Sequence, residues 1–489
     1  MKLFDLLNGV TIIENYGTFD TEIENIASDH RNVTKNTVFV AISGTKRNGN
    51  GYVMEAVKNG AVAIITDENK SYESGVPCVL VSDAREALAK MWSNFYNNPS
   101  KTIKTVAITG TNGKTSSAFF LYNILACANI PCGLISTVGC FINGEEINVN
   151  GGGAVPDLSS AMTTPDPEKL YYLFNKMKEN GVKIAVIEAS SHALAQNRLC
   201  GMEIEIGAFT NLSREHLDFH TDIEDYFCAK EKLFKMCKLG IVNIDDSFGR
   251  IIKEKYTNIF CISVKESTDF RAKDIKLSEN GCEYMLAYNG RNFEIKSSII
   301  GDFTVYNTML AASCAVLLGV DNESIARGIR KTSVIKGRVE KYRDKSIYID
   351  YAHTPDAMKK VITTIKEIEK GKRLIVLFGC GGDRDKGKRA EMGKICSEHA
   401  DISVITSDNP RGENPLEIIK EILLGVDKGK SYTVIENRRE AIIKTVKDLL
   451  ENDVLLLLGK GHEEYEITKE GKHFFSERAV LDEVFSIDK

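Results

Sequence analysis

Two patterns of apolar and polar positions alternate along most of this 489-residue chain. Short apolar runs rich in β-branched residues predict strands, whereas longer stretches with helical periodicity predict helices. In the middle of the chain the patterns predict strands at residues 182–187, 204–209 and 240–244 and helices at 116–128 and 223–237. Further along they predict strands at residues 346–350, 373–378, 402–406 and 453–458. Strands that alternate with helices are typical of parallel βαβ units, so we expect an α/β protein.

Chain length and linker positions predict three α/β domains. A chain of this size has room for about three domains of about 150 residues each. Polar turn residues cluster at positions 97–100, and residues 331–336 have the composition of a linker. We therefore expect domains at residues 1–100, 101–332 and 333–489, with a doubly wound sheet in the central one and a Rossmann-like sheet in the last.

Composition narrows the class of protein. Charged residues make up 27% of the chain and the net charge is −5, which argues against a nucleic-acid-binding protein with a basic face. The twelve cysteines form no C-x-x-C pair, and the first ten residues do not resemble a signal peptide, so we expect a cytoplasmic protein. The longest apolar runs are far shorter than the ~20 residues that span a bilayer, so we expect no membrane insertion.

A phosphate-binding loop is the clearest chemical signal. The sequence Gly110-Thr-Asn-Gly-Lys-Thr115 follows a short apolar run and precedes a helical pattern. Glycines allow backbone N–H groups to surround phosphate oxygens, Lys114 adds a cation, and the Thr115 hydroxyl can bind Mg²⁺. The Walker pattern would place a glycine at Ile108, so only the strand, loop and helix context is met; an ordinary strand-to-helix turn is the alternative. The context predicts a P-loop ATPase-like central domain that binds ATP.

Polar side chains follow several predicted strands, where ligands of open α/β sheets bind. Glu188 is placed as a hard oxygen ligand for Mg²⁺ beside the phosphate loop, or else as a capping carboxylate. His216 is a candidate ligand of a second metal ion, although a lone histidine more often makes a structural hydrogen bond. Asp350 with His353, and the glycine-rich residues 379–385, follow two strands of the last domain.

Lys230 is unusual because it shares a helical stripe with apolar residues. A buried ammonium is costly, so such a lysine lowers its pKa, reaches water, pairs with an acid or is modified. A neutral amine can add CO₂ and become an anionic metal ligand, which leaves a carbamate and a water-reaching amine as alternatives.

Two further segments are complementary to a zwitterion. Asp408-Asn-Pro-Arg411 and Gly459-Lys-Gly-His-Glu463 each follow a predicted strand. Arg411 offers a planar fork for a carboxylate, while Asp408 and Glu463 can accept from an ammonium. The alternative is the chemistry of an ordinary surface turn.

Together, these motifs closely resemble those of the Mur ligases. The resemblance also includes Thr163–Asp166, Val305–Asn307, Gly337-Arg338 and Gly379–Arg389, and its segments occur in family order over about three quarters of the chain. It is strongest to members that add the third residue of the peptide stem. It implies an ATP- and Mg²⁺-dependent ligase that joins meso-diaminopimelate to UDP-N-acetylmuramoyl-L-alanyl-D-glutamate through an acyl phosphate. It also implies an N-terminal UDP-binding domain, and we expect a monomer.

The resemblance assigns roles residue by residue. Nucleotide contacts are implied for Gly110, Thr111, Asn112, Gly113, Lys114, Thr115, Asn307, Arg338 and Asp350, with His353 nearby. Metal binding is implied for Thr115, Glu188, His216 and a carbamylated Lys230. Contacts to the UDP-dipeptide are implied for Thr163, Thr164, Ser191, Gln196 and Arg198. Contacts to diaminopimelate are implied for Arg384, Asp408, Asn409, Pro410, Arg411, Gly459 and Glu463.

The acceptor assignment depends on Arg411, which lysine-adding members usually lack. L-Lysine has no second carboxylate, so a desolvated guanidinium would lack a partner at a cost of several kcal/mol. The sequence departs from the family where Asp-Ser-Arg is usual, because it reads Asp29-His30-Arg31; Ser28 or His30 is the substitute contact. Alternatives are L-lysine as acceptor, a folylpolyglutamate synthetase-like ligase, or a binding protein on a retained ligase fold.

Overall fold

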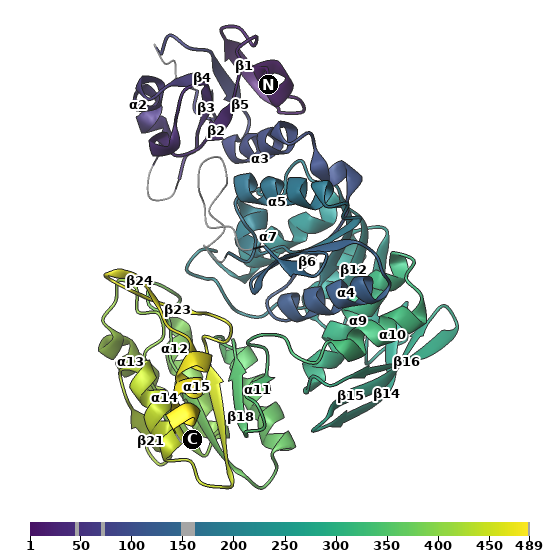
Figure 1. Cartoon of the computed structure of the whole chain (residues 1–489), viewed down its shortest axis with the longest axis vertical. Coiled ribbons are helices and arrows are strands. Elements are labelled where there is room, and N and C mark those ends of the chain that lie inside the picture. Colours follow the sequence, from purple (N-terminus) through teal and green to yellow (C-terminus); the bar gives the residue numbers. More distant parts are fainter. Residues whose placement is uncertain (45–47, 70–73, 148–161, 488–489) are drawn as a thin grey trace. The chain divides into compact units, whose positions relative to one another are not determined.

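The computed structural model describes residues 1–44, 48–69, 74–147 and 162–487, with the side chain of the last left out (Figure 1). The chain forms two compact units. The first contains Met1–Thr109, Asn129–Gly207 and Ala229–Gly240, and the second contains Gly110–Ala128, Ala208–Cys228 and Ile241–Lys489. The three-domain division at residues 100 and 332 stays a prediction.

The N-terminal part of the first unit has a five-stranded sheet in the order β1-β5-β4-β3-β2. The strands are β1 Ile12–Tyr16, β2 Asn25–Ala27, β3 Thr37–Ala41, β4 Ala61–Thr66 and β5 Cys78–Val81. All neighbours are parallel except β1 and β5. Phe39 and Ile64 of this sheet pack with Val53 and Ala56 of helix α2, Val53–Lys58. The other helices of the first unit are α1 Leu3–Leu6, α3 Ala84–Phe95, α5 Pro167–Glu179 and α6 Ser191–Ala195, with 3₁₀ turns at His30–Asn32, Gly49–Tyr52 and Pro99–Thr102.

A second sheet has the order β16-β15-β14-β13-β12-β11-β6-β10-β7-β8-β9. The division between the two units passes through β11 Ile204–Phe209, β12 Cys237–Asn243 and helix α7 Ile223–Met236. The first unit holds β6 Lys104–Thr109, β7 Cys132–Ser136, β8 Gly139–Ile142, β9 Glu145–Glu146 and β10 Ile184–Glu188. The second unit holds β13 Ile259–Ser263, β14 Phe270–Ser278, β15 Gly281–Tyr288 and β16 Arg291–Ser297.

The parallel arrangement predicted for this sheet is right for β6, β7 and β10. β13 and β14 are also parallel, whereas the antiparallel pairs of β14 with β15, of β15 with β16 and of β7 with β8 were not predicted. Several predicted boundaries also shift by a few residues. Glu188 is the last residue of β10, helix α4 begins at Lys114, and β12 begins at Cys237.

Helix α4, Lys114–Cys127, packs against α9, Asp302–Leu317, and α10, Asn322–Lys331, within the second unit. Gly328 of α10 permits a close approach, because a Cβ there would lie 2.8 Å from the backbone nitrogen of Ile124. This packing fixes the helix that follows the phosphate loop. The second unit also contains α8, Ser247–Lys255.

The C-terminal part of the second unit is doubly wound, as predicted. Its sheet has the order β17-β18-β22-β19-β20-β21, and all strands except β17 are parallel. The strands are β17 Glu340–Lys341, β18 Ile347–Asp350, β19 Arg373–Phe378, β20 Ile402–Ile405, β21 Ser431–Val434 and β22 Asp453–Leu458. A separate hairpin pairs β23 Tyr465–Thr468 with β24 Gly471–Phe474.

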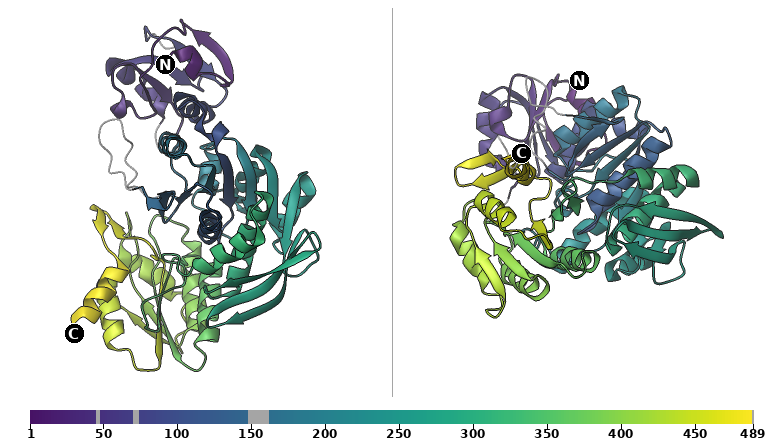
Figure 2. Two further views of the ribbon diagram at one scale, coloured as in Figure 1. Left: turned by 45° about the vertical axis from the view of Figure 1, so that its right-hand side comes forward. Right: turned by 60° about the horizontal axis from the view of Figure 1, so that its bottom comes forward.

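Helices cover both faces of this sheet (Figures 1 and 2). Leu374 and Val376 of β19 pack into one core, whereas Ile375 and Leu377 pack into the other, as period-two alternation requires. The helices are α11 Pro355–Ile368, α12 Gly387–His399 and α13 Pro415–Leu423 on the first face and α14 Arg438–Lys447 and α15 Glu477–Ile487 on the second. No helix among the described residues is long and apolar enough to cross a membrane.

Candidate active site

The phosphate loop has the backbone that its glycines predict. Gly110 and Gly113 have φ of +143° and +87°, values that L side chains rarely adopt. Side-chain space is also missing, because a Cβ on Gly110 would collide with the Thr210 hydroxyl. Lys114 Nζ donates to the carbonyls of Gly110 and Thr111 at 2.9 and 2.8 Å, so its ammonium lies over the loop where a phosphate would bind.

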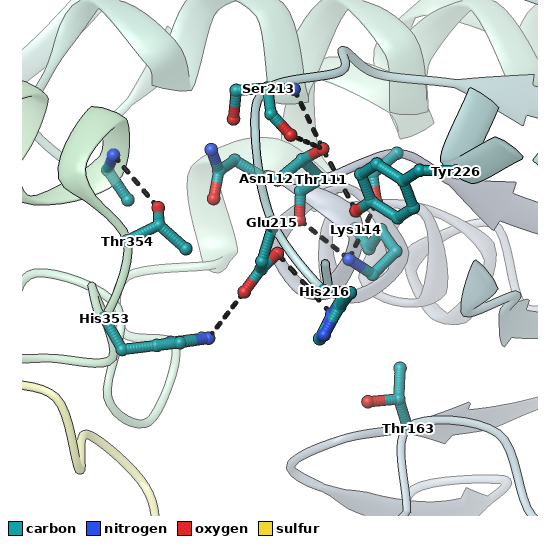
Figure 3. Close-up of polar contacts among 12 residues, drawn as sticks. Thr111, Asn112, Lys114, Thr163, Ser213, Glu215, His216, Tyr226, His353 and Thr354 are labelled. Carbon is teal, nitrogen blue, oxygen red and sulfur yellow. Dashed lines mark hydrogen bonds and ion pairs between the residues drawn. The ribbon is translucent and has the colours of Figure 1, made fainter. Parts of the chain in front are cut away.

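Residues 211–226 hold the loop from one side (Figure 3). The Thr111 hydroxyl accepts from the Ser213 N–H at 3.0 Å and lies 3.2 Å from the Tyr226 hydroxyl. The Asn112 N–H donates to Asn211 Oδ1 at 3.1 Å. Two of the predicted nucleotide residues are therefore held by side chains that the sequence did not single out.

Arg338 lies beside the first turn of α4. Its Nη2 donates to Thr115 Oγ1 at 3.0 Å, and its guanidinium is 4.8 Å from the centre of the Tyr351 ring. Asp350 accepts from the N–H of Val339 at 2.6 Å and of Ala352 at 2.7 Å. Val339 has φ of +45°, which is rare for a β-branched residue, so Asp350 stabilises the strained turn that carries Arg338. The predicted ribose contact of Asp350 stays a prediction.

Asn307 of α9 adjoins the same loop. Its Oδ1 lies 3.4 Å from the Ser117 hydroxyl and would collide with a Cβ on Gly113. Asn307 is thus close to the nucleotide loop, although its predicted contact with adenine is untested.

A cavity of about 150 Å³ gathers most of the remaining predicted residues of the second unit. Its lining combines cationic, acidic and glycine positions: Glu215, His216, Asp218, Tyr351, His353, Gly379, Cys380, Gly381, Arg384, Asp385, Lys388, Asp408, Asn409, Arg411, Gly459 and Glu463. Asp408 and Asn409 are 8% and 3% exposed, so the alternative of an ordinary surface turn is wrong.

Glu215 links the predicted metal ligand His216 to His353 (Figure 3). Its Oε1 is 2.8 Å from His353 Nε2, and its Oε2 is 3.6 Å from His216 Nε2. Burial alone would raise the pKa of Glu215, but the two histidines and Lys388 hold it well below its ordinary value. His353 Nδ1 also lies 2.7 Å from the Tyr351 carbonyl, so both ring nitrogens face acceptors.

Two guanidinium groups that repel each other, those of Arg384 and Arg411, line the cavity. Arg411 Nη1 donates to the carbonyl of Gly382 at 2.9 Å, and Arg384 Nη1 lies 3.6 Å from Asp218 Oδ2. Burial lowers the pKa of Arg411, and the charge of Arg384 lowers it further. Two repelling cations at a cavity are stabilised by an anionic ligand, and their planar forks suit a carboxylate.

In the first unit, β10 ends among several predicted residues. The Glu188 carboxylate is fully buried and accepts from the N–H of Thr137 at 2.9 Å and from its hydroxyl at 3.2 Å. The Thr163 hydroxyl lies 3.1 Å from the Thr137 hydroxyl, and the Thr164 hydroxyl donates to the Glu188 carbonyl at 2.7 Å. Thr163, Thr164 and Glu188 therefore form one polar cluster.

Arg198 extends that cluster. It donates to the Thr164 carbonyl at 2.7 Å and to Gln196 Oε1 at 2.8 Å. Ser191 is 2% exposed, and its hydroxyl has no hydrogen-bond partner among the described residues. A buried hydroxyl of this kind suits the dipeptide contact predicted for it.

The two uridine candidates lie in the N-terminal sheet region. Ser28 is exposed, whereas the His30 ring stacks on Tyr52 with centroids 4.3 Å apart. Asp29 pairs with Arg31, which lowers the pKa of that carboxyl to about 2. His30 is thus held against an aromatic ring, and its contact with a ligand stays a prediction.

Lys230 is 1% exposed within α7. Its amine therefore does not reach water, and that alternative is wrong. Among the described ranges, no three His, Cys, Asp or Glu side chains gather closely enough to hold a metal ion by themselves. Mg²⁺ in nucleotide enzymes usually has one or two protein ligands and takes the rest from phosphates and water.

Comparison with known proteins gives the family. Residues 22–96 match the catalytic domain of the Mur ligase family, residues 108–315 the Mur ligase middle domain, and residues 337–461 the Mur ligase glutamate ligase domain. A relative from Caldanaerobacter subterraneus subsp. tengcongensis is 42% identical over 99% of this chain and 99% of its own length. The chain belongs to the Mur ligase family.

Further similar proteins support the assignment of this Mur ligase to the family. A relative from Clostridioides difficile (strain 630) is 41% identical over 99% of the chain and 100% of its own length. Both relatives are named UDP-N-acetylmuramoyl-L-alanyl-D-glutamate--2,6-diaminopimelate ligase. A solved structure of a ligase of that name has 27% identity and a TM-score of 0.67, covering 100% of this chain and 99% of its own.

The sequence did not reveal how this Mur ligase supports its two arginine loops. Arg389 is 1% exposed, and it donates to Glu413 at 3.0 and 2.8 Å and to Glu421 at 2.8 Å. Glu413 also accepts from the N–H of Asp383 at 2.6 Å. Asp383 precedes Arg384, and Glu413 follows Arg411 by two residues, so this bond joins the two arginine loops. The charged residues Arg389 and Glu413 are visible in the sequence. Only the fold shows that these two residues, 24 positions apart, form an ion pair.

We expect Glu413→Gln to lower the stability of the second unit by about 2 kcal/mol at neutral pH, the usual cost of losing a hydrogen-bonded charge partner. The Arg389 hydrogen bond lowers the pKa of Glu413 to about 2. A depressed carboxyl pKa stabilises the fold above the ordinary value near 4.3 and loses this effect as the pH falls toward 2. Urea midpoints of the two proteins should therefore converge between about pH 5 and pH 2.

Glu417→Gln is the matched control, because Glu417 pairs with Lys420 on the exposed side of α13. Its urea midpoint should equal that of the wild type at neutral pH and at acidic pH. A Glu413→Gln protein whose deficit is the same at neutral and acidic pH would contradict the ion-pair account.

Proposed function

We propose that this Mur ligase adds meso-diaminopimelate to UDP-N-acetylmuramoyl-L-alanyl-D-glutamate, with ATP as the energy source, during synthesis of peptidoglycan precursors. The observation that carries the proposal is the cavity that Arg411 and Arg384 line together with Asp408 and Glu463. An amino acid with carboxylates and ammonium groups at both ends would satisfy both kinds of charge.

ATP supplies the driving force in two bond exchanges. The γ-carboxylate oxygen of D-glutamate attacks the γ-phosphorus of ATP, and ADP leaves with the electrons of the broken P–O bond. The amine of the acceptor then attacks the acyl carbon, phosphate leaves, and the nitrogen loses a proton. An ionised carboxylate is a poor electrophile, so phosphorylation is what makes amide formation possible.

Residues of the chain provide the charge and the position for these exchanges. Lys114 and the N–H groups of the phosphate loop bind the β- and γ-phosphates, and Arg338 approaches from beside Thr115. Glu463 and Asp408 accept from the acceptor's ammonium groups, while Arg411 and Arg384 bind a carboxylate. His353 is held by Glu215, and both residues line the cavity.

The chain's oxygen ligands fit Mg²⁺. Thr115 offers a hydroxyl and Glu188 a fully buried carboxylate, which are the hard ligands that Mg²⁺ prefers. His216 and a carbamylated Lys230 would hold a second ion. Bound Mg²⁺ would neutralise phosphate charge while two anions approach each other. Cytoplasmic location and a monomeric state stay predictions.

The test is product formation by the purified chain with ATP, Mg²⁺, the UDP-dipeptide and meso-diaminopimelate. We expect phosphate release that stops when either cosubstrate is omitted, and a product with the mass of the UDP-tripeptide. With ¹⁸O in the γ-carboxylate, one label should appear in phosphate. ATP hydrolysis without the amide product would overturn the proposal.

A further inference from the structure

A lysine with no exposed surface lies directly behind the cavity. Lys460 is 0% exposed and is among the largest fully buried side chains of the described part of the chain. Its ammonium donates to Asn409 Oδ1 at 3.0 Å and to the Tyr465 carbonyl at 2.8 Å. It also lies 3.6 Å from Glu463 Oε2 and 5.5 Å from the centre of the Phe475 ring. Lys460 is not among the residues that line the cavity.

The position of Lys460 determines which way the Asn409 amide points. Asn409 Oδ1 receives two donors, the Lys460 ammonium and the Ile467 N–H, each at 3.0 Å. Neither group can accept a hydrogen bond, so the atom that faces them must be the amide oxygen. The amide nitrogen must then face the cavity side, where it donates to Glu463 Oε2 at 2.9 Å.

The Glu463 carboxylate is fixed in turn. Its Oε2 accepts from Asn409, while its Oε1 lies 3.2 Å from the Tyr465 hydroxyl and 3.4 Å from the Tyr351 hydroxyl. Three donors from three segments thus set the orientation of one carboxylate at the cavity wall. An amide turned by 180° would direct its oxygen at Glu463 and repel it.

The free-energy cost of burying the Lys460 ammonium is offset by nearby carboxylates. Burial would raise the pKa of Asp408, but Lys460 and Arg438 hold it below its ordinary value. Asp408 lines the cavity and Arg438 is 2% exposed. Lys460 therefore serves both the charge balance and the geometry of the wall.

We propose that Lys460 is a positioning residue for the acceptor amino acid: by fixing the Asn409 amide it orients Glu463, which receives the acceptor's ammonium. The inference rests on the proposed function, because it deepens the account of how the same cavity selects a zwitterion. It predicts that Lys460 governs acceptor binding and not nucleotide binding.

The test compares Lys460→Met with wild type. Methionine keeps an unbranched chain of similar length but removes the charge and the donors. We expect the dissociation constant for meso-diaminopimelate to rise about 30-fold, which corresponds to leaving a buried polar group without its hydrogen-bond partner. The constant is measured by calorimetry in the presence of the UDP-dipeptide and a non-hydrolysable ATP analogue. The KM for ATP should change by less than about twofold, within ordinary additivity error.

Lys472→Met is the matched control, because Lys472 lies 4.1 Å from the centre of the same Tyr465 ring but is on the exposed β24. Its acceptor affinity should equal that of wild type. A Lys460→Met protein with wild-type acceptor affinity, or with equal losses for acceptor and ATP, would overturn the proposal.

A double variant separates positioning from general structure. In an Asn409→Leu background, adding Lys460→Met should weaken acceptor binding by a much smaller factor than in wild type, because the amide that Lys460 orients is already gone. If Lys460→Met weakens acceptor binding by the same factor with and without Asn409→Leu, the inference is contradicted.

If Lys460→Met does not fold, Asn409→Asp provides the test. It keeps an oxygen for Lys460 and Ile467 but places a second oxygen opposite Glu463, so acceptor affinity should fall about 30-fold. Unchanged affinity would overturn the inference. Wild-type turnover is measured first: no amide product in wild type refutes the proposed function, whereas turnover with normal acceptor affinity in the variants refutes only the role of Lys460.

Discussion

Replacing Lys230 with alanine will lower turnover about 10³-fold if Lys230 carries the proposed carbamate, because loss of an anionic metal ligand near the phosphates costs several kcal/mol in the transition state. Lys230 is 1% exposed, and burial of an ammonium is costly, which favours a neutral or modified amine at this position. Steady-state phosphate release measures the loss. Short carboxylic acids added to the alanine variant should restore part of the activity, because they can take the place of a carbamate.

Lys235→Ala is the control for this prediction, since Lys235 is exposed on the same helix. It should retain wild-type turnover. Intact-protein mass should also show the added mass of CO₂ on wild type and its loss after acid treatment. Full activity of Lys230→Ala would contradict the carbamate account.

Replacing Arg411 with methionine will lower kcat/KM for meso-diaminopimelate about 10²- to 10³-fold, the effect of removing one partner of a desolvated, hydrogen-bonded ion pair. The KM values for ATP and the UDP-dipeptide should be unchanged, because Arg411 lines the cavity and its guanidinium donates to the carbonyls of Gly382 and Asn409. Activity with L-lysine should not fall, since lysine has no second carboxylate to lose.

Arg439→Met is the matched control, because Arg439 pairs with Glu483 on the exposed surface and is about half exposed. It should behave as wild type with both acceptors. An Arg411→Met protein that loses activity equally with diaminopimelate and L-lysine would show that Arg411 has no part in acceptor choice.

The sequence predicted the C-terminal sheet well because its central strands are buried on both faces. β19 and β22 were predicted to the residue, and each has a near-continuous apolar run. The antiparallel meander was missed because β14 and β16 are largely exposed and polar, with burial confined to a few positions. Short apolar runs were the only strand signal used, and these strands do not have them.

Motifs predicted much of the candidate site, since Asp408, Arg411 and Glu463 do line one cavity. Their supporting contacts were not predictable. Glu215 and His353 are 138 positions apart, and Lys460 and Asn409 are 51 apart. Period and spacing report only local neighbours, so a bond between two loops becomes visible only when strand order brings their ends together.

The most direct test of the central claim is the ratio of kcat/KM for meso-diaminopimelate to that for L-lysine, measured on the wild-type chain with saturating ATP and UDP-dipeptide. When L-lysine is bound, the Arg411 guanidinium has no carboxylate partner, so we expect a ratio of at least about 10² in favour of diaminopimelate. A ratio near one, or a preference for L-lysine, would contradict the account of Arg411 and of the acceptor.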